Sequence, residues 1–229
     1  MPNPFQSLFA AILNDDRTKV KELFDNDPGL ARRSVAEEER YESRIAHWIY
    51  AGDTVLHAAA AGYRVEIARM LLAAGADPAS ARNRRSSQAL HYAADGYLDN
   101  PSWNARRQVA MIRLLLKAGS NIDAQDKNGA TPLHRAVRTR CAAAVKCILD
   151  AGGDPTIRNK PGSTPFHLAV QNTGRGGTGS EQARTAQREI LQTFLERGVS
   201  PTLKDAKGKS VLEWAQNDGI RQVLSGHVI

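Results

Sequence analysis

The chain has 229 residues, a net charge of +7 and a hydrophobic content of 41%, which is enough for a core. It has no long uninterrupted apolar run, so the sequence predicts no membrane-spanning helix. The positive charge by itself predicts only non-specific attraction to anions. The first thirteen residues lack a basic segment, and we expect a helix there and not a signal peptide.

The N-terminal segment, residues 5–27, has the apolar spacing of two short helices. Asp15 and Asp16 can cap the second of them. Residues 28–53 then form a longer connection, charged in its first half and aromatic in its second. Two alternatives stay open for its aromatic half: Trp48 and Tyr50 pack back onto the helices that follow, or the segment overhangs a groove as a finger and contacts a partner.

From residue 54 onward one short motif recurs along the chain. It reads TVLHAA at 54–59, QALHYA at 88–93, TPLHRA at 131–136, TPFHLA at 164–169 and, in a degenerate copy, SVLEWA at 210–215. Threonine is a good helix N-cap and proline suits the first helical position. A second helical pattern follows each motif and ends near a glycine such as Gly152, which supplies the left-handed residue that stops a helix. Each unit is therefore expected to be a turn followed by a helical hairpin.

This pattern and its period of 33 residues resemble the ankyrin repeat. The composition is similar to that of bacterial ankyrin proteins. The resemblance implies an all-α solenoid of about five to six repeats, caps included, and we expect one ankyrin-repeat domain over residues 1–229. Its expected parts are an N-terminal cap (5–27), a long first hairpin or finger (28–53), repeat 1 (54–81), repeat 2 (82–123), repeat 3 (124–155), repeat 4 (156–201) and a C-terminal cap (202–229). Extra residues at about 97–105 in repeat 2 and 173–185 in repeat 4 predict insertions between the two helices.

The sequence predicts no catalytic, cofactor-binding or metal-binding residue. The resemblance implies that His57, His91, His134 and His167 hydrogen-bond the preceding turn and the neighbouring repeat, and repeats about 10 Å apart cannot share a zinc ion with Zn–N bonds of about 2 Å. The segment 174–179 matches G-x-G-x-x-G, but a helix precedes it where a nucleotide site needs a strand, so we interpret it as a flexible insertion. Cys141 and Cys147 are expected to be unbridged thiols, as in a reducing compartment.

The ankyrin resemblance further implies a concave groove lined by the turns and by the exposed face of each first helix. The turns are nearly all basic, and arginine suits fork-shaped contacts with carboxylates. A basic row beside an aromatic ring suits an acidic peptide or protein; the alternative is a charged rim that only keeps the protein in solution. The residues expected to bind a partner are Arg84, Arg85, Tyr92, Lys127, Arg135, Arg138, Lys160, Leu168 and Gln171, with Trp48 of the finger.

The sequence therefore predicts a non-catalytic protein-interaction module that acts as a monomer. The alternative is electrostatic binding of nucleic acid or another polyanion by the basic rim; an enzyme is not expected. A cytoplasmic protein is expected, although the sequence does not separate it from a secreted effector.

Overall fold

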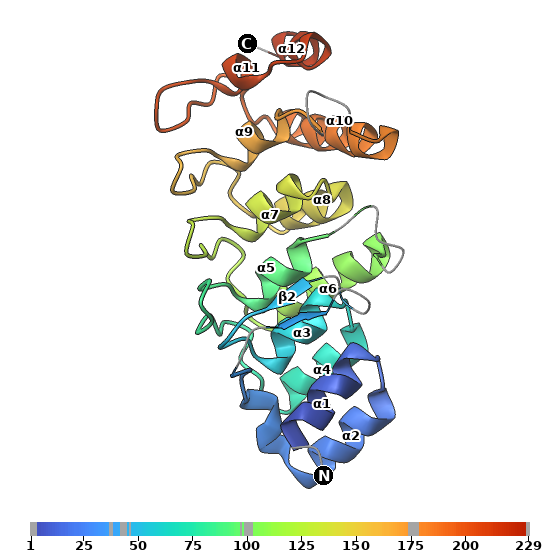
Figure 1. The fold of residues 1–229 in the computed structure, drawn as a ribbon. Coiled ribbons are helices and arrows are strands. Elements are labelled where there is room, and N and C mark those ends of the chain that lie inside the picture. The colour runs from blue at the N-terminus through green and yellow to red at the C-terminus, as the bar shows by residue number, and fades with distance from the viewer. Residues whose placement is uncertain are drawn as a thin grey trace.

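The computed structural model describes residues 4–36, 39–41, 45, 47–96, 98, 103–173 and 179–227. Within them the chain forms an elongated stack of helix pairs, and each pair packs on the pair that follows it in sequence (Figure 1). The first and last pairs lie at opposite ends of the stack. This confirms the all-α solenoid that the repeated motif predicts.

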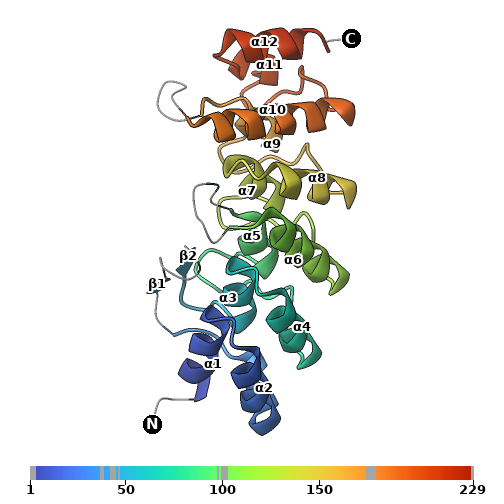
Figure 2. The ribbon, with the colours of Figure 1, turned by 90° about the vertical axis from the view of Figure 1, so that its right-hand side faces the viewer.

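The helices form two layers, which Figure 2 shows side by side. The inner helices are α1 (Pro4–Leu13), α3 (Val55–Ala61), α5 (Ala89–Ala94), α7 (Pro132–Arg138), α9 (Pro165–Ala169) and α11 (Val211–Trp214). The outer helices are α2 (Arg17–Asn26), α4 (Val65–Ala73), α6 (Ala105–Lys117), α8 (Ala142–Asp150), α10 (Glu181–Glu196) and α12 (Asp218–Ser225). No helix in the described part of the chain is both long and apolar enough to span a membrane.

The recurring histidine caps the N-terminus of its own inner helix and also hydrogen-bonds to the next repeat. At α7 the backbone N–H of Thr131 donates to Nδ1 of His134 over 3.1 Å, and the Thr131 hydroxyl lies 2.9 Å from the same nitrogen. The opposite ring nitrogen, Nε2, donates to the carbonyl of Ser163 in the following repeat over 3.1 Å. The same bridge joins His57 to Ser87, His91 to Ala130 and His167 to Lys209. The structure thus gives these histidines the structural role that the resemblance implies.

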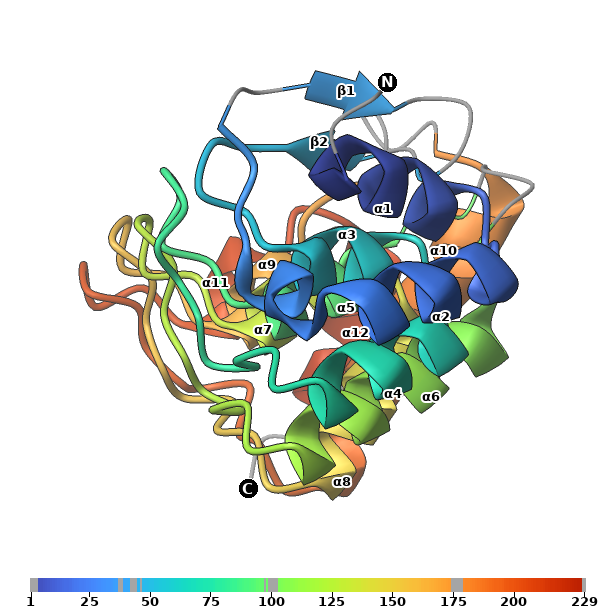
Figure 3. The same cartoon turned by 90° about the horizontal axis from the view of Figure 1, so that it is seen from below.

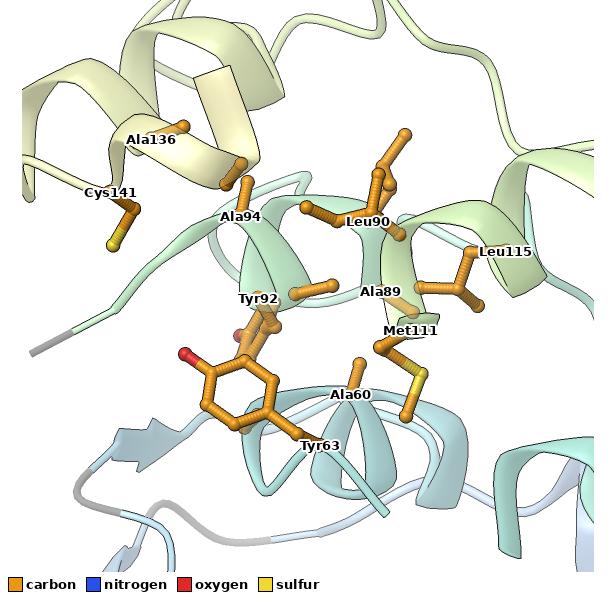
Figure 4. Close-up of a cluster of buried hydrophobic side chains, with 14 of the residues drawn as sticks. Ala60, Tyr63, Ala89, Leu90, Tyr92, Ala94, Met111, Leu115, Ala136 and Cys141 are labelled. Carbon is orange, nitrogen blue, oxygen red and sulfur yellow. The ribbon is translucent and has the colours of Figure 1, made fainter. Parts of the chain in front are cut away.

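Alanine-rich inner helices allow the repeats to stack closely. Figure 4 shows Ala60, Ala89 and Ala94 lying between larger side chains such as Leu90 and Met111. All five are almost completely buried, and the same core continues along the stack into both caps. Because each repeat buries its apolar face only against its neighbours, the whole stack depends on these contacts.

The two helices of a repeat are joined in two ways. In repeats 1 and 3 the joint is a tight turn with a residue in the left-handed region, Tyr63 (φ 53°) or Arg140 (φ 60°). In repeats 2 and 4 the joint is longer, and residues 97, 99–102 and 174–178 of the predicted insertions lie outside the described residues. Helix α10 begins at Glu181, so residues 181–185, which the sequence analysis assigned to the second insertion, are helical.

The longer joints leave the ends of α5 and α9 without a following turn, and a glutamine from the outer helix caps each of them. Gln108 Nε2 lies 3.1 to 3.3 Å from the carbonyls of Ala93, Ala94 and Asp95. Gln187 Nε2 donates to the carbonyls of Ala169 and Gln171 over 2.7 Å each. Both glutamine side chains are buried and satisfy helix-end acceptors, and at α9 the guanidinium of Arg140 donates to the same two carbonyls.

The finger between the cap and repeat 1 begins with a short 3-10 helix, η1 (Pro28–Arg32), and ends in a β-hairpin that the sequence did not predict. Strands β1 (Glu39–Tyr41) and β2 (His47–Ile49) pair antiparallel, and the hairpin lies on α3, on the side away from the outer helices (Figure 3). Along β2 the burial alternates, with His47 and Ile49 buried and Trp48 exposed. The finger therefore packs back onto repeat 1.

Candidate interaction surface

The turns between repeats form one edge of the stack, which we call the turn edge and define as residues 81–87, 124–130, 157–163 and 204–209. Backbone hydrogen bonds connect each turn to the next one (Figure 1): Lys127 N–H donates to Arg85 O over 2.7 Å, Lys160 N–H to Asn128 O over 2.9 Å, and Ala206 N–H to Gly162 O over 3.0 Å. Gly129 is required in this ladder, because its φ is +72° and a Cβ there would lie 2.8 Å from the Lys160 nitrogen. The ladder holds the turns in a fixed row.

The exposed charges of the turn edge all have one sign. The acidic residues of these segments, Asp126 and Asp205, are buried, because their carboxylates accept hydrogen bonds from the backbone of their own turns. In the other two turns the uncharged amide oxygens of Asn83 and Asn159 accept the corresponding backbone hydrogen bonds. The cations of the turn edge that remain at the surface are Arg82, Arg84, Arg85, Lys127, Arg158, Lys160, Lys204, Lys207 and Lys209.

Arg135 does not face the groove, which corrects the expectation from the sequence. Its side chain is only 4% exposed. One guanidinium nitrogen lies 2.7 Å from Asp95 Oδ2, and the other lies 2.7 Å from Asp126 Oδ2 and 3.0 Å from the Ser87 hydroxyl. Arg135 therefore joins repeats 2 and 3 from the inside and is not available to a partner.

Mutual charge stabilises the ionised forms in this buried cluster. Burial alone would raise the pKa of Asp95, but the charge of Arg135, followed by His47 and Arg138, outweighs burial and holds that pKa well below its usual range. Burial would likewise lower the pKa of Arg135, and Asp95 and Asp126 reverse the shift and raise it. The cluster is therefore charged at neutral pH.

Tyr92 is also buried, which corrects the second expectation. Its hydroxyl donates to the carboxylate of Asp53, 2.7 Å from Oδ2, and its ring contacts that of His47 in the hairpin, with 4.4 Å between centroids and a tilt of 32°. Burial, then the charge and hydrogen bond of Asp53, raise the pKa of the Tyr92 hydroxyl above its usual value. Figure 4 shows the ring inside the apolar cluster. It holds the hairpin on repeat 2 and offers no surface to a partner.

Arg138, Leu168 and Gln171 reach the surface of the inner layer beyond the hairpin. The side chain of Arg138 is 59% exposed, and Nη2 lies 3.2 Å from Asp95 Oδ1. Leu168 is half-buried and Gln171 is exposed. Of the groove residues expected from the sequence, these three therefore lie where a second molecule can reach them.

Two family models describe these helix pairs. One, described as Ankyrin repeats (3 copies), matches residues 103–205, and another, described as Ankyrin repeat, matches residues 51–84. Together they cover more than half of the chain. The chain belongs to the ankyrin-repeat family. No individual protein with a curated description matches it.

Ankyrin repeats are in general protein–protein interaction modules, and proteins built from them are typically non-enzymatic. Within the described residues no cluster of three or more His, Cys, Asp and Glu side chains could hold a metal ion. Cys141 and Cys147 are free and buried, and burial raises the pKa of the Cys141 thiol to about 11. The G-x-G-x-x-G segment lies, apart from Gly179, outside the described residues.

A cavity of about 900 Å³ lies on the outer side of the ankyrin stack, between α8, α10 and α12. Its lining combines apolar side chains such as Leu191 and Ile220 with the cations of Lys146 and Arg188. Glu189 contributes a carboxylate to the same lining.

One aromatic residue of the finger, Tyr50, lies against the turn at residues 81–87. The Tyr50 ring lies 5.2 Å from the guanidinium of Arg85 and 5.6 Å from that of Arg84, and Arg85 donates to the Tyr50 hydroxyl over 3.0 Å. Trp48, in contrast, is 46% exposed on the outward face of the hairpin. Tyr50 therefore packs back, as one alternative predicted, while Trp48 stays accessible.

The sequence analysis missed the two capping glutamines. A signal existed for the glutamines: Gln108 and Gln187 each stand 11 residues before the glycine that ends their outer helix, Gly119 and Gly198. The corresponding residues of repeats 1 and 3 are Arg64 and Cys141. The amide thus marks the two ankyrin repeats with long joints.

Proposed function

We propose that this chain is a non-catalytic interaction module that binds a protein with an acidic surface, through the turn edge and the open part of the groove. The observation that carries the proposal is the single sign of the exposed charges on the turn edge, since its two carboxylates, Asp126 and Asp205, are buried. Adjacent turns are about 10 Å apart and fixed by backbone hydrogen bonds, so the cations are held in position before a partner arrives.

A protein partner is favoured over nucleic acid by the composition of the turns. Binding of single strands typically combines cations with aromatic rings on which bases stack. The turn edge contains no Phe, Trp or Tyr. The ring of Tyr50 lies against Arg84 and Arg85, and the ring of Trp214 donates to the buried carboxylate of Asp205 over 3.0 Å. Carboxylates on a folded or extended polypeptide need no such platform.

The proposal assigns no cofactor, metal or catalytic residue to the chain and takes it to act as a monomer. It places the protein in the cytoplasm, and the unpaired thiols of Cys141 and Cys147 support a reducing compartment.

The test compares two triple charge reversals that change the net charge equally. One is on the turn edge, Lys127→Glu with Lys160→Glu and Lys207→Glu. The control is on outer helices, Lys21→Glu with Lys117→Glu and Lys146→Glu, all of them exposed. Each immobilised variant captures partners from cells that express the protein, after nuclease treatment, and mass spectrometry quantifies them.

We expect the turn-edge variant to lose its acidic partners and the control to retain them. With about 1 kcal/mol for each reversed contact, the affinity should fall roughly a hundredfold. Equal capture by the two variants would refute the proposal. Capture that nuclease abolishes, with a salt slope of about −0.9 per phosphate contact, would favour the polyanion alternative.

A further inference from the structure

The β1–β2 hairpin occupies the inner face of repeats 1 and 2 in the way that a bound peptide would. It is an extended segment laid across the inner helices, with Ile45, His47 and Ile49 turned toward them and buried. Figure 3 shows it on the face of α3 that is opposite to α4. The contacts of the hairpin therefore show what kind of chain this face accepts.

The seat of the hairpin on repeat 2 consists of two residues, Tyr92 and Asp95. The His47 ring packs on the Tyr92 ring at a tilt of 32°, and its Nε2 lies 3.5 Å from Asp95 Oδ2. These residues stand one and four positions after the repeat histidine, His91. The aromatic ring of Tyr92 and the carboxylate of Asp95 thus bind the imidazole of His47 at these two positions.

The same two positions can be compared in repeats 3 and 4, whose inner face the hairpin does not cover. In repeat 3 the residue four positions after the histidine is Arg138, where repeat 2 has Asp95, so the charge is reversed. In repeat 4 the two positions hold Leu168 and Gln171. Beyond the hairpin, the groove thus offers an exposed cation and then an apolar side chain with an amide beside it.

Arg138 has donors left for a second carboxylate. Its ion pair with Asp95 uses Nη2, and Asp95 is already held by Arg135 at 2.7 Å. A guanidinium has five N–H donors, and 59% of the Arg138 side chain is exposed. A carboxylate from outside can therefore bind without breaking the buried pair.

The spacing between the two open positions sets the register of a ligand. Neighbouring repeats are about 10 Å apart, and an extended chain in the polyproline II conformation advances about 3.1 Å per residue with three residues per turn, so every third side chain lies on the same side. Side chains that reach Arg138 and Leu168 are therefore about three residues apart.

We propose that the groove over repeats 3 and 4 binds an extended segment of the partner, with an Asp or Glu at Arg138 and an apolar side chain three residues away at Leu168. This inference rests on the proposed function and specifies its ligand. The hairpin restricts the segment to these repeats, because it covers the same face of repeats 1 and 2.

The experiment selects ligands from random sequences, so the natural partner need not be identified first. Phage-displayed random 12-residue peptides are selected on the full chain, on Arg138→Glu and on the control Arg188→Glu, an exposed arginine of α10 on the outer side. Fluorescence anisotropy then measures the affinity of the selected peptides. Arg138→Gln is included, because the new carboxylate of Arg138→Glu would face Asp95, and thermal unfolding shows whether each variant is folded.

On the wild type and on the control we expect enrichment of an acidic residue three positions from Leu, Ile, Phe or Met. On Arg138→Glu we expect a basic residue in place of the acidic one. The wild-type peptide should bind Arg138→Glu and Arg138→Gln at least tenfold more weakly, and the turn-edge triple variant within about threefold of the wild type.

Three results would overturn the inference: the same consensus on Arg138→Glu as on the wild type, no enriched peptide on the wild type, or binding that depends on the turn-edge cations alone. The last result leaves the proposed function standing. Peptides that respond to neither set of cations would count against both.

Discussion

Arg135 and Asp95 form an ion pair that is almost completely buried, with Nη1 2.7 Å from Oδ2. The pair joins the inner helices of repeats 2 and 3, and Asp95 also meets the hairpin through His47. A buried carboxylate without its cation is costly, so the two residues depend on each other.

The first prediction concerns this pair. Arg135→Ala should lower the free energy of unfolding by about 3–5 kcal/mol, because it leaves the buried carboxylates of Asp95 and Asp126 without their shared cation. Asp95→Ala should cost less, because Arg135 keeps its ion pair with Asp126. Arg138→Ala, which removes an exposed partner of the same carboxylate, should cost about 1 kcal/mol or less. Urea unfolding followed by circular dichroism measures all three. A similar cost for Arg135→Ala and Arg138→Ala would show that the cluster does not hold repeats 2 and 3 together.

The second prediction is an acid sensitivity that comes from the repeat histidines. Burial, followed by the charge of Arg135, lowers the pKa of His91 to about 4, and burial lowers the pKa of His57, His134 and His167 in the same direction. A folded-state pKa below the unfolded value of about 6.5 gives stability that is complete above pH 6.5 and is lost as the pH falls toward 4.

For His91 alone the loss at pH 4 is about 3 kcal/mol. His91→Asn should therefore be less stable than the wild type at pH 7 and should lose less on acidification. Urea midpoints between pH 7 and pH 4 measure the two slopes. Parallel slopes would show that His91 does not gain a proton on unfolding in this range. Asp95 contributes in a separate window, below its unfolded pKa of about 3.9.

Local patterns in the sequence were enough to predict the solenoid, whereas the two wrong site residues depend on distant partners. Capping residues and the glycines act within a few positions, so the motif predicts each helical hairpin and each turn. Arg135 is drawn inside by Asp95, 40 positions away, and Tyr92 by Asp53, 39 positions away. The exposure of Arg138 could be predicted from its position in the repeat, because its ion pair with Asp95 leaves most of the side chain in solvent.

The third prediction concerns the glutamine caps of the long joints. Gln187→Ala removes one of the two donors to the carbonyls of Ala169 and Gln171, the other being Arg140, and should cost about 1 kcal/mol. Gln192→Ala on the same helix is the matched control, because its exposed bond to Glu196 contributes about 0.5 kcal/mol or less. Urea midpoints of the two variants test the difference. Equal values would mean that the long joint of repeat 4 does not need the amide.

The fourth prediction tests whether the hairpin is a fixed part of the stack. Ile49 is completely buried beneath it, and Ile49→Ala should lower the free energy of unfolding by about 2–5 kcal/mol. Trp48 precedes Ile49 and is 46% exposed, so Trp48→Ala should cost less stability than Ile49→Ala. The amide of Val35, which donates to Asp53 O over 2.7 Å, should become less protected from hydrogen exchange in Ile49→Ala and stay protected in Trp48→Ala. If Ile49→Ala changed neither stability nor exchange, the hairpin would be free of the stack, and the groove would be open over repeats 1 and 2 as well.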